Sequence, residues 1–246
     1  MAQTSRRKFL TGTAALFSGP IAAPSFGLEA LEEIAEQRAA EAALAAAAPP
    51  AEPAPRPPRS DPANWDGWDR RVTPANYDPS TSNPWGLHPR FLPVRVEAND
   101  GLTPGDIHVD AVARYLYHIQ NDGTAMRYGV AIARGSLYEP GVYTIRRKAK
   151  WPTWRPTDAM IEREPETFER HKDGMDGGPS NPLGSRALYL YVGNRDTYLR
   201  IHGTPSPRSI GGRASSGCVR MVMAHIIDLY DNVETGVTAH LYAAEI

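Results

Sequence analysis

The feature that most constrains the fold is a series of short runs rich in β-branched and aromatic residues. The runs begin after position 91, each is only a few residues long, and most are bounded by Gly, Pro, Asn or Asp. Several short strands with little helix predict a mainly β domain, a β-sandwich or barrel-like sheet with one or two short helices. The runs cover residues 107–110, 115–119, 128–132, 142–145, 187–192, 198–202 and 237–242.

One later segment has helical periodicity. Val222, Ile226, Tyr230 and Val233 fall on one face, and Gly236 stands where a helix would end. Between the predicted strands, residues 151–184 form a long Pro- and Gly-containing stretch. Loops of this length inside a compact domain are usually lids or binding loops, although surface decoration is the alternative.

The amino terminus has the layout of an export signal. Arg6 and Arg7 are followed by Lys-Phe-Leu, a weakly polar, apolar stretch and small residues near positions 22–27. The adjacent arginines are similar to a twin-arginine (Tat) signal. We therefore expect residues 1–27 to be a signal peptide that engages the Tat export machinery, and the protein to reach the bacterial periplasm.

A spacer follows the expected signal. Residues 28–60 begin with helix-forming Ala, Glu and Leu and continue into a Pro-rich stretch at 49–58 that favours an extended chain. This stretch is either a passive tether or a docking site for another protein. Residues 61–106, which include several Trp and Tyr, are predicted to be an ordered arm or the start of the domain, and residues 107–246 the main folded domain.

Composition excludes several classes of protein. The formal net charge is -1, with 27 Lys+Arg against 28 Asp+Glu, so the chain lacks the basic excess of a nucleic-acid binder. A single Cys excludes an intrachain disulfide and any multi-Cys metal site. The histidines other than His202 have no metal-ligand spacing and are expected to be structural or solvated; they are His88, His108, His118, His171, His225 and His240.

Cys218 and His202 are the candidate catalytic pair. Cys218 follows Ser-Ser-Gly and precedes Val-Arg, a polar setting for a residue type that is usually buried and inert. An imidazole beside a thiol can take its proton and so produce a nucleophile. Because no acid is near His202 in sequence, the backbone carbonyl of Gly203 is the expected orienting group. The alternative for His202 is a strand-end histidine bonded to a loop.

Three segments carry a resemblance to a known family. Residues 201–204 read Ile-His-Gly-Thr, residues 209–211 read Ser-Ile-Gly, and residues 215–221 read Ser-Ser-Gly-Cys-Val-Arg-Met. This order is similar to the signature of the L,D-transpeptidase catalytic domain (YkuD-type), and the similarity extends over residues 107–242. Many members carry a second His where this chain has Ser216, which leaves open how the nucleophile loop is braced.

The resemblance implies a ping-pong acyl transfer on peptidoglycan stem peptides, without metal or cofactor. Cys218 would attack the diaminopimelate–D-Ala bond, His202 would move the proton, and the N–H groups of Gly217 and Cys218 would form the oxyanion hole. Arg220 would bind a substrate carboxylate, or instead brace the loop through an ion pair. The other residues expected to bind substrate are Ser215, Ser216, Asn181 and Tyr189.

Three functions stay open at this point. The first is an exported L,D-transpeptidase whose acceptor is another stem, a free D-amino acid or the amine of an envelope protein. The second is a cysteine L,D-carboxypeptidase or endopeptidase on the same scaffold, because water and amines compete for one thioester. The third is a non-catalytic wall-binding module.

Overall fold

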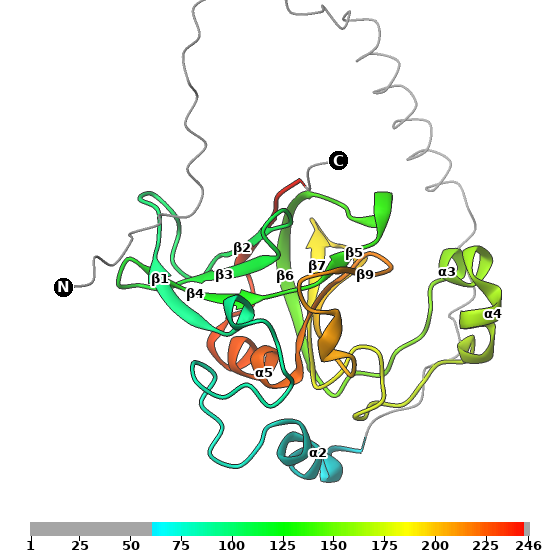
Figure 1. The fold of residues 1–246 in the computed structure, drawn as a ribbon. Helices are drawn as coiled ribbons and strands as arrows, with labels where there is room; N and C mark the ends of the chain where they lie inside the picture. The colour runs from blue at the N-terminus through cyan, green and yellow to red at the C-terminus, as the bar shows by residue number, and fades with distance from the viewer. Residues whose placement is uncertain (1–60, 244–246) are drawn as a thin grey trace, which may run out of the picture. The chain divides into compact units, whose positions relative to one another are not determined.

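A computed structural model describes residues 61–243. The predicted signal peptide, helix and Pro-rich spacer, residues 1–60, lie outside the described residues. Most of the strands form one mixed sheet, in which their spatial order is β1-β4-β3-β2-β11-β6-β7-β8-β10 (Figure 1). A second, two-stranded sheet consists of β5 and β9. The strands are β1 (Val94–Glu97), β2 (Ile107–Asp110), β3 (Tyr115–Ile119), β4 (Thr124–Gly129), β5 (Ile132–Ala133), β6 (Gly141–Lys150), β7 (Arg186–Val192), β8 (Arg195–Thr204), β9 (Arg213–Ser215), β10 (Val219–Val222) and β11 (Thr238–Leu241).

The large sheet curls back on itself. Neighbouring strands are antiparallel except for two parallel pairs, β8 with β10 and β2 with β11. The outer edge of β10 does not stay free, because Ala131, just after β4, exchanges two backbone hydrogen bonds with Arg220, at 2.8 and 2.9 Å. The edge strand β10 is thereby hydrogen-bonded to the segment that follows β4.

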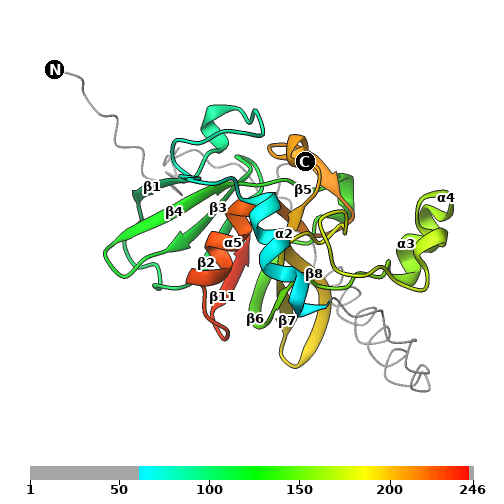
Figure 2. The same cartoon turned by 90° about the horizontal axis from the view of Figure 1, so that it is seen from below.

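Four α-helices lie among the described residues. α5 (Met223–Asn232) follows β10 directly and packs on β7 and β8, and α2 (Trp65–Val72) lies beside it (Figure 2). α3 (Asp158–Arg163) and α4 (Pro165–Phe168) project to one side, away from the sheet (Figures 1 and 2). The 3-10 turns are η1 (Pro62–Asn64), η2 (Pro89–Phe91), η3 (Gly135–Leu137), η4 (Glu169–His171) and η5 (Pro207–Ser209).

Alternation along the strands decides which side chains form the core. In β8, Leu199 and Ile201 are buried in the main hydrophobic cluster, together with Val219 and Met221 of β10 and Ile226 of α5. Because successive side chains of a strand point to opposite faces, the residues between these apolar positions face the other side of the sheet. The core therefore fixes the face on which the candidate site lies.

The segment before β1 is attached to the domain through α2. Asp69 accepts hydrogen bonds from both terminal nitrogens of Arg186, at 2.7 and 2.9 Å, and from the Trp151 indole at 3.0 Å. Trp151 is fully buried, and Trp68 packs edge-on against it with ring centroids 5.2 Å apart. These contacts hold α2 at the point where β6 leaves the sheet.

The mainly β fold predicted from the sequence is confirmed, and the differences lie in particular elements. The run 128–132 is not one strand: β4 ends at Gly129, and β5 begins at Ile132. Between them the chain changes partners, since the Val130 N–H binds the Arg114 carbonyl and Ala131 binds β10. The strands β1, β9 and β10 and the helices α2, α3 and α4 were not predicted from the sequence.

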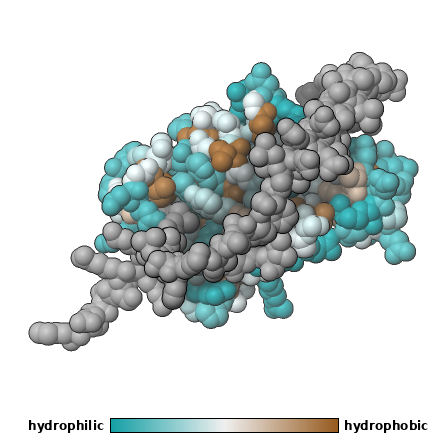
Figure 3. Space-filling model, turned by 90° about the horizontal axis from the view of Figure 1, so that it is seen from above, coloured by the Kyte–Doolittle hydropathy of each residue, from teal (hydrophilic) through white to brown (hydrophobic). Residues whose placement is uncertain are grey.

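One face of the domain has a mixed, mostly hydrophilic surface (Figure 3). On the face drawn in Figure 3, hydrophobic side chains occur in small groups among hydrophilic ones. Within residues 61–243, no helix has both the length and the apolar character that a membrane crossing requires.

Candidate active site

The parallel pairing of β8 with β10 brings the two sequence motifs together. In its register, Arg220 pairs with His202 and Val219 pairs with Ile201. Paired residues of neighbouring strands point to the same face, so His202 and Arg220 share the face opposite the core. Cys218 comes one residue before β10 and accepts a hydrogen bond from the backbone N–H of Arg200. The fifteen residues between His202 and Cys218 include η5 and β9, and they return the chain to the neighbouring strand.

His202 is buried and held as a neutral imidazole. Its Nδ1 lies 2.6 Å from the carbonyl oxygen of Gly203, and only 4% of the residue is exposed. Because a carbonyl oxygen can only accept, this contact assigns the proton to Nδ1 and leaves Nε2 as an acceptor. Burial, followed by the charge of Arg220, lowers the pKa of His202 to about 3.

Cys218 is likewise held in its neutral form. Burial raises the pKa of its thiol, while the Arg200 N–H and the charges of Arg200 and Arg220 act in the opposite direction. The sulfur lies 3.7 Å from the carbonyl oxygen of Tyr198, to which the thiol donates. The thiol is thus protonated and directed at the Tyr198 carbonyl oxygen, while Nε2 of His202 carries no proton.

Ser215 braces the loop that carries Cys218. Its hydroxyl donates to the carbonyl oxygen of Cys218 and accepts a long, 3.4 Å hydrogen bond from the Gly217 N–H. Gly217 has φ of +145°, a region that favours glycine, and a Cβ there would lie 3.4 Å from Leu199. Ser215 is 2% exposed, whereas the neighbouring Ser216 is partly exposed. The buried hydroxyl of Ser215 thus braces the loop that contains Ser216.

Arg220 has no ion-pair partner within residues 61–243. Its guanidinium is half-buried, and its Nε is buried without a hydrogen bond. Burial lowers its pKa, as does the nearby charge of Arg134. The structure thus offers no support for an ion pair that braces the loop, and it leaves this cation available next to His202.

Asn181 is used inside its own loop. The side chain is fully buried, donates to the carbonyl oxygen of Asp176 at 2.8 Å and accepts from the Leu183 N–H at 2.8 Å. Gly184 follows at φ +64°, where a Cβ would lie 2.8 Å from the Gly203 backbone. The structure therefore places Asn181 in a turn that lets the loop approach β8, and not on an open surface.

Tyr189 lies on the same face as Arg200, which is its partner in the pairing of β7 with β8. The tyrosine is 6% exposed because guanidinium groups cover its ring: that of Arg200 lies 4.1 Å from the ring centroid and that of Arg147 lies 4.3 Å from it. Neither arginine was predicted from the sequence as part of the site. The alternation Tyr198-Arg200-His202 along one strand was the available signal for Arg200.

The long loop after β6 reaches the neighbourhood of the nucleophile loop. Glu164, at the junction of α3 and α4, pairs with Arg134 at 2.8 Å, and the Arg134 backbone N–H donates to the Ser215 carbonyl oxygen. The loop that was expected to be a lid or binding loop is thus attached at its tip to the segment beside Ser215.

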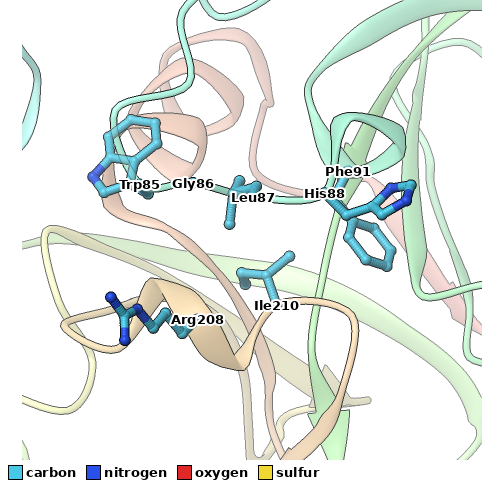
Figure 4. A pocket seen from close by; sticks show the side chains of 7 residues that line it. All are labelled: Trp85, Gly86, Leu87, His88, Phe91, Arg208 and Ile210. Carbon is cyan, nitrogen blue, oxygen red and sulfur yellow. The ribbon is translucent and has the colours of Figure 1, made fainter.

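A pocket of about 360 Å³ lies elsewhere, between the segment before β1 and η5. It is lined by Trp85, Leu87, His88, Phe91 and Ile210, with Arg208 at one end (Figure 4). None of the predicted site residues lines it. Among the described residues, no group of three or more His, Cys, Asp or Glu side chains is arranged to hold a metal ion.

The fold and the site define a class: a mainly β domain with a cysteine and a histidine on the same face of paired parallel strands. A family model for the L,D-transpeptidase catalytic domain (YkuD) matches residues 104–241, more than half of the chain. The chain belongs to this family.

Individual relatives agree with this assignment. The chain is 29% identical over 147 residues to a probable L,D-transpeptidase ErfK/SrfK of Escherichia coli K12, covering 59% of this chain and 46% of that protein. It is 35% identical over 140 residues to a putative L,D-transpeptidase of Fuscovulum blasticum, covering 56% and 69% of the two chains. The chain thus spans about half the length of the E. coli relative.

A solved structure from Brucella melitensis is also similar in sequence. It is described as a probable carnitine operon oxidoreductase and is 46% identical. The match covers 67% of this chain and 99% of that one, at a TM-score of 0.44. At that TM-score, the likeness supports no conclusion about activity.

Proposed function

We propose that the protein is an exported L,D-transpeptidase in which Cys218 is the nucleophile and His202 the proton carrier. The proposal rests on one observation above all, the register that pairs Arg220 with His202 and puts Cys218 beside Arg200. Peptidoglycan stem peptides are the substrates that the family implies.

The reaction begins with the neutral pair. Nε2 of His202 takes the thiol proton as the Cys218 sulfur attacks the diaminopimelate carbonyl carbon, and the carbonyl oxygen becomes an oxyanion. The N–H groups of Gly217 and Cys218 are the donors for that oxyanion, and Gly217 gives up only its long contact with Ser215. Such donors are worth about 3–4 kcal/mol each in the transition state.

The second half regenerates the enzyme. The tetrahedral intermediate collapses, the C–N bond breaks, and D-Ala leaves with the proton that His202 returns to its amine. An acceptor amine then attacks the thioester and gives a proton to His202, which passes it to the departing sulfur. Arg220, without an acidic partner among the described residues, is the group that binds a substrate carboxylate near this centre.

The acceptor determines which activity is seen. Incubating the protein with disaccharide-tetrapeptide and a D-amino acid, followed by mass analysis, separates the outcomes. An exchanged or crosslinked stem identifies a transferase, and a tripeptide alone identifies a carboxypeptidase. Cys218→Ala should abolish D-Ala release, and turnover retained by this variant would disprove the mechanism.

Export is part of the proposal because the substrate lies outside the inner membrane. It is supported by the pattern around Arg6 and Arg7. Changing both arginines to Lys should leave the protein inside the inner membrane, as measured by cell fractionation. Unchanged periplasmic recovery would contradict a twin-arginine route.

A further inference from the structure

A row of side chains crosses the face of the sheet that holds the candidate pair. Cys218 neighbours Arg200 of β8, Arg200 pairs with Tyr189 of β7, and Tyr189 pairs with Arg147 of β6. The guanidinium groups of Arg200 and Arg147 lie 4.1 and 4.3 Å from the Tyr189 ring centroid. The tyrosine ring therefore contacts two cations, on strands that lead across the sheet from Cys218.

The two arginines differ in their partners. Both oxygens of Asp196 accept hydrogen bonds from Arg200, at 2.6 and 2.8 Å, so this charge is matched inside the protein. Arg147 is exposed, and within residues 61–243 it forms no ion pair and no side-chain hydrogen bond. Its planar fork is positioned by the Tyr189 ring, and its donors are left unused.

The spacing of the row sets the size of ligand that Arg147 can reach. Cys218 and Arg147 lie three strand positions apart, about 14 Å between their backbones at the usual spacing of neighbouring strands. Because the guanidinium leans back over Tyr189, its donors lie closer, roughly 10 Å from the reacting sulfur. A carboxylate about six or seven bonds from the attacked carbonyl carbon spans roughly that distance in an extended peptide.

We propose that Arg147, held on Tyr189, determines specificity for a free carboxylate on the acyl donor, about six or seven bonds from the attacked carbonyl. The inference rests on the proposed function for the position of the reacting carbon. A stem tetrapeptide carries two such carboxylates, that of the diaminopimelate side chain and the α-carboxylate of D-glutamate. Both offer the planar, bidentate partner that an arginine fork binds.

The test compares Arg147→Gln with the matched control Arg146→Gln. Arg146 is the preceding exposed arginine, and it donates to Asn194 in the turn between β7 and β8 instead of joining the row. With synthetic stem tetrapeptide, Arg147→Gln should raise KM for D-Ala release by about 5- to 20-fold and leave kcat within twofold. Arg146→Gln should change neither. An unchanged KM in Arg147→Gln would overturn the proposal.

Two amidated peptides identify the carboxylate. The peptide amidated at the group that Arg147 binds should raise KM for the wild-type protein and show no further loss in Arg147→Gln. The peptide amidated at the other group should still show the loss. If the wild-type protein has the same KM for both amidated peptides as for the parent peptide, Arg147 does not bind a carboxylate and the proposal fails.

A binding measurement separates this proposal from the catalytic one. Cys218→Ala, alone and combined with Arg147→Gln, is titrated with the tetrapeptide by calorimetry. If Arg147→Gln weakens tetrapeptide binding but the wild-type protein releases no D-Ala, the Arg147 site stands and the transpeptidase activity is refuted. Equal affinity in both variants would refute the Arg147 site whatever the turnover.

Discussion

His225 makes the stability of this domain depend on pH. It lies in α5, is fully buried, and neither ring nitrogen has a hydrogen bond in the described structure. Aromatic rings surround it: those of Tyr77, Trp85 and Tyr128 have centroids 6.3, 5.5 and 6.5 Å away. Burial lowers its pKa from 6.5 to about 3, so folding selects the neutral imidazole.

The sign follows from the two protonation states. The unfolded chain binds a proton as pH falls through 6.5, whereas the folded chain does not until about pH 3. The stability that the neutral His225 contributes is fully present above the pKa of the unfolded state and is lost as pH falls toward the pKa of the folded state. Between pH 7.5 and 5.0, this one residue removes about 2 kcal/mol of unfolding free energy.

Replacing His225 with Phe removes the proton site and keeps an aromatic ring. Urea unfolding at the two pH values should show that His225→Phe loses about 2 kcal/mol less than the wild-type protein between them. The comparison across pH cancels any packing change, because that change is the same at both values. His88→Phe, at an exposed histidine, controls for adding a ring. An equal pH dependence in wild type and His225→Phe would refute the reasoning.

Three further predictions address the site and its support. His202→Ala should slow iodoacetamide labelling of Cys218, the single cysteine, by about tenfold at neutral pH, because the thiol loses its proton acceptor; an unchanged labelling rate would separate the two residues. Ser215→Ala should lower kcat about tenfold with the domain still folded by circular dichroism, because the hydroxyl holds the Cys218 carbonyl and the Gly217 N–H; unchanged kcat would deny the loop brace. Asp69→Ala should lower the free energy of unfolding in urea by roughly 3–5 kcal/mol, because it leaves the Arg186 side chain, which is 3% exposed, without its ion-pair partner. A loss under 1 kcal/mol would show that water replaces the carboxylate.

The local sequence pattern predicted those strands in which polar and apolar residues alternate or apolar residues predominate. The runs at 107–110 and 115–119 match β2 and β3, and the helical face around Ile226 matches α5. Val219–Val222 is a strand for a non-local reason: it pairs with β8 on one edge and with Ala131 on the other. A segment of four residues is too short for its hydrophobic pattern to indicate a strand.

The candidate site was predictable where a motif marks it and not where tertiary contacts create it. Cys218 and His202 stand in a motif, and the sequence therefore drew attention to them. Asn181 was expected to bind substrate, and in the structure its amide closes a turn. Arg147 is 53 positions from Arg200, and only the pairing of β6, β7 and β8 brings both onto Tyr189.

The charges near the pair explain why substrate has to start the proposed chemistry. The cation of Arg220 favours the thiolate of Cys218 but opposes the imidazolium of His202, so the same group lowers the pKa of both partners. Burial disfavours either ion, and it is the largest influence on each. A resting ion pair is therefore unfavourable. Proton transfer becomes favourable as the sulfur's charge passes to the substrate oxygen, where backbone N–H groups receive it. In the proposed mechanism, the thiol therefore gives up its proton to His202 as it attacks an electrophile, and not in the resting protein.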